Sequence, residues 1–229
     1  MKTASGSDAW EETLVIALKD ARLRGDLRVP AGAAGIVIFA HGSGSGRLSP
    51  RNRFVAGYLF KKKIGSLLFD LLTEDEETRD AMTGAFRFDI PFLTRRLTAA
   101  TDWLAARLQA RKRELPLGYF GASTGAAAAL TAAAEKPELI KTVVSRGGRP
   151  DLAAAALAEV RAPTFLIVGG NDTVVIKLNQ DACRELRVEK GIHIVPNATH
   201  LFEEPGALEE VAAAAAQWFG RHFAAGGGA

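Results

Sequence analysis

The sequence predicts an α/β fold: a mostly parallel, twisted sheet of about eight strands with helices on both faces and a minimal cap, in one domain over residues 1–229. Two runs of alternating polarity come first, which is typical of half-buried antiparallel strands. Continuous apolar runs follow, as expected for strands that are buried on both faces. Helical stretches separate these runs, and repeated strand–helix units indicate a parallel sheet.

The individual elements follow from these patterns in chain order. The alternating pair is predicted at residues 13–18 and 21–29, and the continuous apolar strands are predicted at 35–40, 65–72, 117–120, 140–145, 163–169 and 191–196. Helices are predicted at 51–62, 89–109, 124–135, 174–186 and 207–222, with a short one at 151–160 whose N-cap is Asp151.

Two kinds of segment are expected to lie outside this framework. The acidic stretch 73–80 is predicted to be a loop that forms a solvated rim or a minimal cap over the cleft. It is too short for a lid domain, which indicates an open pocket for small substrates. Residues 1–10 and 224–229 are predicted to be flexible tails.

Composition excludes several classes of function. The net charge is only +3, and the basic clusters 61–63 and 111–113 lie at predicted helix ends, so nucleic-acid binding is not expected. The single Cys183 excludes an internal disulfide and a multi-cysteine zinc site, and we predict no metal and no cofactor. The N-terminus lacks the apolar run of a signal peptide, and no segment is long and apolar enough to span a membrane. We therefore expect a cytoplasmic monomer or homodimer that acts on a small molecule.

A serine between two glycines follows one of the buried strands, in the stretch LGYFGASTGAAAAL (residues 117–130). Chemistry in parallel α/β sheets is found at the carboxyl ends of the strands, so the position of Ser123 is informative. One interpretation is a nucleophile on a sharp strand-to-helix turn, where only small neighbours such as Gly121 and Gly125 fit. The alternative is a tightly packed glycine turn in which Ser123 is merely the helix N-cap.

A serine nucleophile needs a base, and the chain has four histidines. His193 lies within a predicted strand, His222 lies in the last helix, and His41 ends a strand in a glycine loop. His200 lies in a loop just before the last helix, where it can reach over the edge of the sheet. His200 is therefore the predicted base.

The ordered strand-end motifs HGSGSG (41–46), GASTG (121–125), GGND (169–172) and NATH (197–200) resemble those of α/β-hydrolases, and among these the small, lid-poor dienelactone-hydrolase-like enzymes. The resemblance covers nearly the whole chain and implies that Asp172 is the acid that orients His200. The alternative for Asp172 is an ordinary turn aspartate, with Asp151 as the reserve acid. One feature departs from the family: dienelactone hydrolases proper use a cysteine nucleophile, whereas this chain has Ser123 at the matching position.

The developing oxyanion needs hydrogen-bond donors, commonly two. We predict the backbone N–H of Thr124 and that of Ser43, with Gly44 as the next candidate. The glycine loop 41–46 could instead hold a phosphate, but neither spacing typical of nucleotide-binding glycine loops occurs in it.

Three further residues are candidates for binding substrate: His41, Arg47 and Arg146. The segment SRGGR (145–149) places two arginines after a strand, where they could hold a carboxylate or phosphate. Arg51 and Arg53 are weaker candidates of the same kind, and pairing with Asp or Glu within the protein is the alternative for all of them.

The sequence thus predicts a serine hydrolase that cleaves small carboxylic esters or lactones through an acyl-enzyme intermediate, using Ser123, His200 and Asp172. An acyltransferase or amidase with the same triad is one alternative. A catalytically silent binding protein of the same fold is another, although no member of the triad is missing from the chain.

Overall fold

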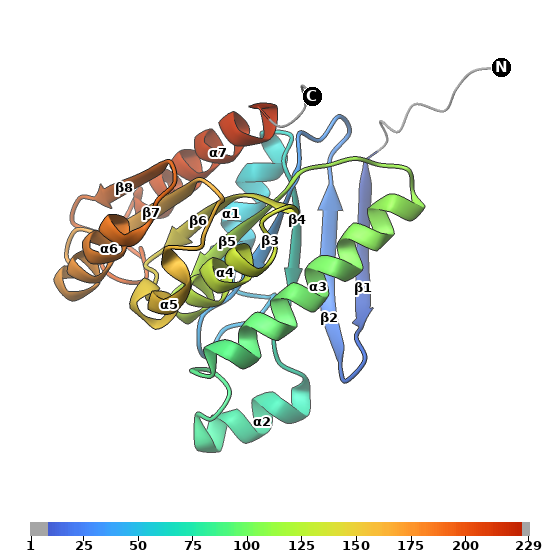
Figure 1. The fold of residues 1–229 in the computed structure, drawn as a ribbon, viewed down its shortest axis with the longest axis horizontal. Coiled ribbons are helices and arrows are strands. Elements are labelled where there is room, and N and C mark those ends of the chain that lie inside the picture. The colour runs from blue at the N-terminus through green and yellow to red at the C-terminus, as the bar shows by residue number, and fades with distance from the viewer. Residues whose placement is uncertain (1–8, 226–229) are drawn as a thin grey trace.

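The computed structural model describes residues 9–225, which form one eight-stranded sheet between two layers of helices (Figure 1). The strands are β1 (Trp10–Ala17), β2 (Arg22–Val29), β3 (Ile36–Ala40), β4 (Gly65–Phe69), β5 (Leu117–Ala122), β6 (Ile140–Arg146), β7 (Thr164–Gly169) and β8 (Lys190–Val195). Their order across the sheet is β1-β2-β4-β3-β5-β6-β7-β8. The β1–β2 and β2–β4 pairs are antiparallel and all others are parallel, which confirms the predicted fold class.

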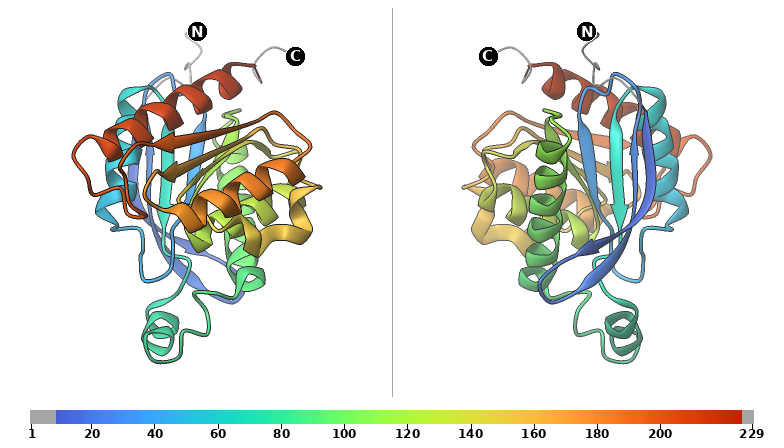
Figure 2. Two further views of the ribbon diagram at one scale, coloured as in Figure 1. Left: turned by 90° about the vertical axis from the view of Figure 1, so that its left-hand side faces the viewer. Right: turned by 90° about the vertical axis from the view of Figure 1, so that its right-hand side faces the viewer.

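Helices cover both faces of the sheet (Figure 2). They are α1 (Pro50–Lys61), α2 (Glu74–Thr83), α3 (Ile90–Ala110), α4 (Thr124–Glu135), the 3₁₀ helix η1 (Pro150–Ala153), α5 (Ala154–Leu157), α6 (Thr173–Glu185) and α7 (Ala207–Ala225). Helices α1 and α7 lie on one face, and α3, α4, α5 and α6 lie on the other. Because β3 is buried on both faces, Val37 and Phe39 pack beneath α1 and α7, while Ile36 and Ile38 join the core of the opposite face.

The prediction that residues 73–80 form a loop is wrong, because they begin helix α2. Thr73 and Glu76 form a capping box: the Glu76 N–H donates to Thr73 Oγ1 (3.3 Å), and the Thr73 N–H donates to Glu76 Oε2 (2.8 Å). Glu76 also pairs with the buried Arg96 of α3 at 2.7 Å, which attaches the helix to the body of the protein. Figure 1 shows α2 at the lower end of the molecule, apart from the two helical layers.

Two smaller predictions are also corrected. Asp151 does not cap a helix; its carboxylate forms two hydrogen bonds with Arg149, and the segment begins with a 3₁₀ turn instead of the predicted helix. Trp10 belongs to β1 and Ala224 to α7, so those residues are not tails. The rest of the predicted tails, 1–8 and 226–229, lie outside the described residues.

None of the helices within residues 9–225 combines the length and apolar character needed to cross a membrane.

Candidate active site

Ser123 lies on a strained turn between β5 and α4. Its φ of 51° and ψ of −121° are unusual for a residue with a side chain. Close packing enforces the turn: a Cβ on Gly121 would lie 2.4 Å from Ala126 Cα, and one on Gly125 would lie 2.2 Å from the Ala40 carbonyl oxygen. Ser123 occupies the N-cap position of α4, but its side chain makes no capping hydrogen bond. The interpretation of Ser123 as a capping serine therefore does not hold.

His200 and Asp172 are joined by a short hydrogen bond. The distance from His200 Nδ1 to Asp172 Oδ2 is 2.6 Å, and 16% of the Asp172 side chain is exposed. Because an ionised carboxylate can only accept, Nδ1 carries the proton and Nε2 keeps its lone pair. Asp172 stands at the N-cap of α6 without capping it, so its carboxylate serves the imidazole and not the helix.

The loop after β6 lies against both Ser123 and His200. The Ser123 N–H donates to the Arg146 carbonyl oxygen (3.3 Å), and a Cβ on Gly147 would lie 3.5 Å from both Nδ1 and Cε1 of His200. Gly169, at the end of β7, allows the loop that carries His200 to approach closely, since a Cβ on Gly169 would lie 2.4 Å from the Ala198 carbonyl oxygen. The predicted nucleophile, base and acid are therefore gathered at one edge of the sheet.

Two of the other histidines have partners elsewhere. His193 lies on the outer strand β8, and its Nε2 is 2.7 Å from Oε1 of Glu210 on α7. His222 packs against Trp218, and burial lowers its pKa. Neither is near Ser123 in the topology, so His200 is the histidine best placed to act as the base.

His41 fixes the glycine loop that follows β3. The Leu71 N–H donates to His41 Nε2 (2.9 Å), so Nδ1 carries the proton and donates to the Gly42 carbonyl oxygen (3.0 Å). Burial lowers the pKa of His41 and keeps the ring neutral. Both ring nitrogens are thus occupied by backbone groups, which makes His41 a support of the loop. His41 also lines the cavity, but no ring nitrogen is free to bind a substrate by a hydrogen bond.

The glycine loop passes close to Ser123. A Cβ on Gly42 would lie 3.0 Å from Ser123 Cβ. The Ser45 N–H closes a turn by donating to the Gly42 carbonyl oxygen (3.2 Å), with Ser43 and Gly44 as its central residues and Gly44 at φ 66°. Thr124 is the first residue of α4, and the first N–H groups of a helix have no acceptor within it. The predicted oxyanion donors Thr124 and Ser43 therefore border the same space.

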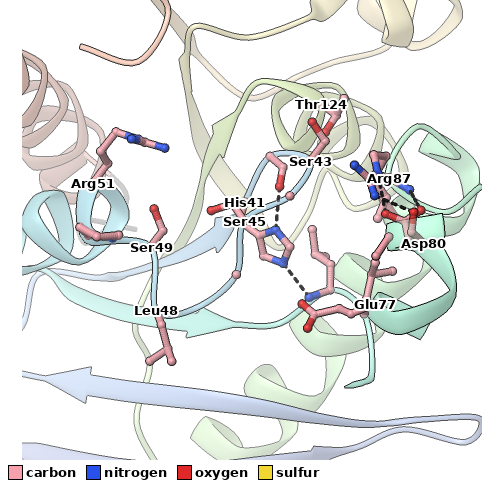
Figure 3. A pocket seen from close by; sticks show the side chains of 18 residues that line it. His41, Ser43, Ser45, Leu48, Ser49, Arg51, Glu77, Asp80, Arg87 and Thr124 are labelled. Atoms are coloured by element: carbon pink, nitrogen blue, oxygen red, sulfur yellow. Dashed lines mark hydrogen bonds and ion pairs between the residues drawn. The ribbon is translucent and has the colours of Figure 1, made fainter. Parts of the chain in front are cut away.

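That space is a cavity of about 510 Å³ (Figure 3). It is lined by residues 41–46 and 48–51, by Thr124, and by residues of α2 together with Arg87. Thr124 connects it to the triad, since Ser123 is the preceding residue and is not itself in the lining. Figure 3 shows Arg51 and Arg87 on opposite sides of His41. The position of this segment beside the cleft agrees with the predicted rim or cap. Its helical structure was missed because acidic residues resemble a solvated loop, although the T-x-x-E capping box at 73–76 was a visible signal.

The α2 wall carries one paired carboxylate, Asp80, and one carboxylate, Glu77, that has no ion-pair partner among residues 9–225. Asp80 accepts hydrogen bonds from the backbone N–H groups of Phe86 and Arg87 and from Arg87 Nε (2.6 Å). Burial raises the pKa of Asp80, but these hydrogen bonds outweigh it and hold the pKa below its usual value. The pKa of Glu77 is raised, first by burial and then by the neighbouring carboxylates of Asp70, Glu74 and Asp80.

The arginines proposed as substrate ligands separate into two groups. Arg47 pairs with Asp26 (3.1 Å) and Asp70 (3.2 Å), as in the alternative of pairing within the protein, and is not among the residues that line this cavity. Arg53 is exposed on α1 and also lies outside the cavity lining. Arg51 does line the cavity, and Arg146 is buried beside Ser123 without a carboxylate partner among residues 9–225.

Comparison with known proteins points to one family. The model of the family described as "Dienelactone hydrolase family" matches residues 56–224. The crystal structure of a dienelactone hydrolase from Anabaena variabilis is 52% identical, with a TM-score of 0.90, and the match covers 94% of this chain and 99% of that one. Est1E from Butyrivibrio proteoclasticus shares the fold at 14% identity, with a TM-score of 0.75 and coverage of 93% and 99%.

A curated relative has a longer chain and a different name. A protein of Mycobacterium tuberculosis, found in two strains and provisionally named a phosphoribosyl transferase, is 54% identical over 199 residues. The match covers 87% of this chain but only 44% of the relative. The chain thus spans less than half the length of this curated relative.

Proposed function

Because this chain belongs to the dienelactone hydrolase family, we propose that it is a serine hydrolase of small carboxylic esters or lactones. The observation that carries the proposal is the 2.6 Å hydrogen bond from His200 Nδ1 to Asp172, at the same edge of the sheet as the strained Ser123. Ser123 is the nucleophile, His200 the base and Asp172 the residue that orients the imidazole.

The first half of the reaction acylates Ser123. Its Oγ forms a bond to the ester carbonyl carbon while His200 Nε2 takes the hydroxyl proton. Asp172 stabilises the imidazolium, and the N–H groups of Thr124 and Ser43 donate to the oxyanion. When the tetrahedral intermediate collapses, the bond to the alcohol oxygen breaks and that oxygen takes the proton from His200.

The second half releases the acid. His200 removes a proton from water as its oxygen attacks the acyl carbon, and the same oxyanion donors stabilise the second intermediate. The bond to Ser123 Oγ then breaks and Oγ regains the proton. A lactone follows the same steps, except that its alcohol remains attached to the acyl chain.

The cavity supports a small acyl group. Its volume of about 510 Å³ is in the usual range for small-molecule pockets. Leu48, Leu71, Leu72 and Leu93 give it apolar walls next to the oxyanion donors. These features suit a short hydrocarbon or hydroxylated acyl chain better than a long lipid chain.

The transferase name of the curated relative is assigned to a protein of which this chain matches less than half. The family match, residues 56–224, includes Ser123, Asp172 and His200. We therefore assign the hydrolase activity to this segment and leave the transferase name with the remainder of the longer protein.

The test uses p-nitrophenyl acetate and a fluorophosphonate probe. Ser123→Ala is expected to reduce kcat by about 10⁴-fold or more and to abolish labelling by the probe. Ser66→Ala is the matched control: it removes a buried hydroxyl on β4 that has no hydrogen-bond partner, and both readouts should stay at the wild-type level. Wild-type hydrolysis by Ser123→Ala would overturn the proposal.

A further inference from the structure

Arg146 is a buried guanidinium that has no carboxylate partner among residues 9–225. It ends β6 and is 8% exposed. Its Nε and Nη1 are inaccessible to solvent, and neither has a hydrogen-bond partner within residues 9–225. The third nitrogen, Nη2, is not among these sealed atoms, and the residue as a whole keeps 8% of its surface exposed.

The surroundings of Arg146 contain positive charge and an aromatic ring. The guanidinium lies 5.9 Å from the centre of the Phe202 ring. Burial lowers the pKa of Arg146 to about 10, and the nearby positive charge of Arg51 adds to the effect. Arg51 pairs with Glu203 at 3.2 Å, but the Glu203 side chain is 65% exposed, so solvent screens its charge.

The other buried arginine and a half-buried one both have carboxylate partners. Arg96, whose side chain is 5% exposed, contacts Glu76 at 2.7 Å. Arg47, at 15%, contacts two aspartates. A buried charge with no partner is strongly unfavourable, and such groups are found at functional sites more often than elsewhere. The absence of a carboxylate beside Arg146 therefore needs an explanation that the fold does not supply.

Arg146 lies beside the catalytic groups. Its carbonyl oxygen accepts the Ser123 N–H, and the next residue, Gly147, lies against the His200 ring. Its side chain packs on Phe202, two residues after His200 in the same loop. Because His200 returns its proton to the leaving oxygen, the alcohol of the ester leaves on the side of this loop.

We propose that the substrate is an ester whose alcohol part carries a carboxylate or phosphate, and that Arg146, assisted by Arg51, binds this oxyanion. The proposal rests on the proposed hydrolase function and specifies its substrate class. The oxyanion accepts hydrogen bonds from the guanidinium and places the leaving oxygen near His200. Charge balance supports it, since Arg146, Arg51 and Glu203 leave one positive charge in excess.

Anion binding can be measured without any turnover. Inorganic phosphate and acetate are titrated into wild type and Arg146→Met, and the midpoint of thermal unfolding is followed at constant ionic strength. We expect at least one of these anions to raise the midpoint of wild type but not that of Arg146→Met. Arg149→Met is the matched control, because Arg149 is already paired with Asp151, and it should respond as wild type does.

The midpoint without anions gives a second readout. Replacement of an unpaired buried guanidinium by an apolar side chain should leave the midpoint of Arg146→Met unchanged or higher. A clear fall in that midpoint, together with no anion response of wild type, would show that Arg146 is a structural residue and would overturn the proposal.

Kinetics identify the part of the substrate that carries the charge. Three acetate esters are compared, formed with ethylene glycol, glycolate and 2-hydroxyethyl phosphate. Wild type should prefer at least one charged alcohol over the neutral one by about 10- to 100-fold in kcat/KM, as expected for hydrogen bonds to a charged group. Arg146→Met should lose this preference, whereas Arg149→Met should keep it.

A further pair of esters moves the charge to the acyl side: methyl hydrogen succinate and methyl butyrate. If wild type prefers only the charged acyl group, or prefers no charged ester at all, the proposal is wrong. If Arg146→Met does not fold, the preference of wild type among these esters still decides whether the charged group belongs on the alcohol part of the substrate. Hydrolysis of the neutral esters separates this outcome from failure of the hydrolase function itself.

Discussion

Asp172→Asn tests whether Asp172 supports the charge that develops on His200. The 2.6 Å bond from Nδ1 to Oδ2 places the centres of the two charges roughly 4 Å apart once the imidazole is protonated. At an effective dielectric constant of about 20 this attraction is worth about 4 kcal/mol. The His200 side chain is 39% exposed, and screening by solvent reduces the figure to about 3 kcal/mol.

Loss of this interaction should lower kcat/KM by about 100- to 1000-fold. The assay is p-nitrophenyl acetate hydrolysis, with far-UV circular dichroism to check folding. Asp151→Asn is the matched control, since Asp151 was the reserve acid predicted from the sequence and is already paired with Arg149; its kcat/KM should stay within about threefold of wild type. Equal losses in the two variants, or no loss in Asp172→Asn, would refute the role of Asp172.

Three further predictions concern stability, measured by urea unfolding. Gly125→Ala should destabilise the protein by about 3 kcal/mol or more, because its Cβ would meet backbone atoms at 2.2 and 2.4 Å. Gly57→Ala is the control: its Cβ would lie in open space on α1 and should stabilise the protein by about 0.5–1 kcal/mol. Equal effects of the two substitutions would contradict the packing argument. Thr101→Val should cost about 1–3 kcal/mol, since it leaves the buried Tyr119 hydroxyl without the Thr101 oxygen at 2.7 Å; a neutral effect would contradict this. Acidification below pH 6.5 should destabilise wild type by up to about 1.4 kcal/mol per pH unit, because burial lowers the pKa of His41 and only the unfolded chain then takes up the proton. His41→Asn should flatten this dependence of stability on pH. An unchanged slope in that variant would assign the dependence to other groups such as His222.

The sheet was predictable because its signal is local. Each buried strand is a continuous apolar run, so its approximate position can be identified without knowledge of its neighbours. Helix α4 has the predicted bounds, 124–135, since a glycine turn begins it and Pro137 follows it closely. The same local patterns locate Ser123, which comes directly after β5, and His200, which lies in the loop between β8 and α7.

The partners of charged side chains were not predictable in the same way. Arg47 pairs with Asp26 and Asp70, which are 21 and 23 residues away, and they meet only because β2 pairs with β4 in one particular register. The two hydrogen bonds of His41 likewise depend on the position of Leu71 beyond β4. Composition names the groups that can pair, whereas register decides which of them do.

Helix α2 was missed for a different reason. Four acidic residues in its first turn suggested a solvated loop, yet acidic groups are favoured at a helix N-terminus, where they interact with the dipole. The charge pattern was thus compatible with both structures. The capping box of Thr73 and Glu76 distinguishes them, because it satisfies N–H groups that only a helix leaves unpaired.

The charged residues on the α2 side of the site differ from those beside His200, and this difference indicates how a substrate is oriented. On the α2 side, Asp80 and Arg87 neutralise each other beside a cavity with leucine walls, which suits an uncharged acyl group. On the His200 side, Arg146 retains its charge because no carboxylate within residues 9–225 neutralises it. An ester that carries its charge on the alcohol satisfies both sides in a single orientation. The reverse orientation would place the oxyanion near the unpaired carboxylate of Glu77, whose pKa is already raised by its acidic neighbours, and leave Arg146 without a partner.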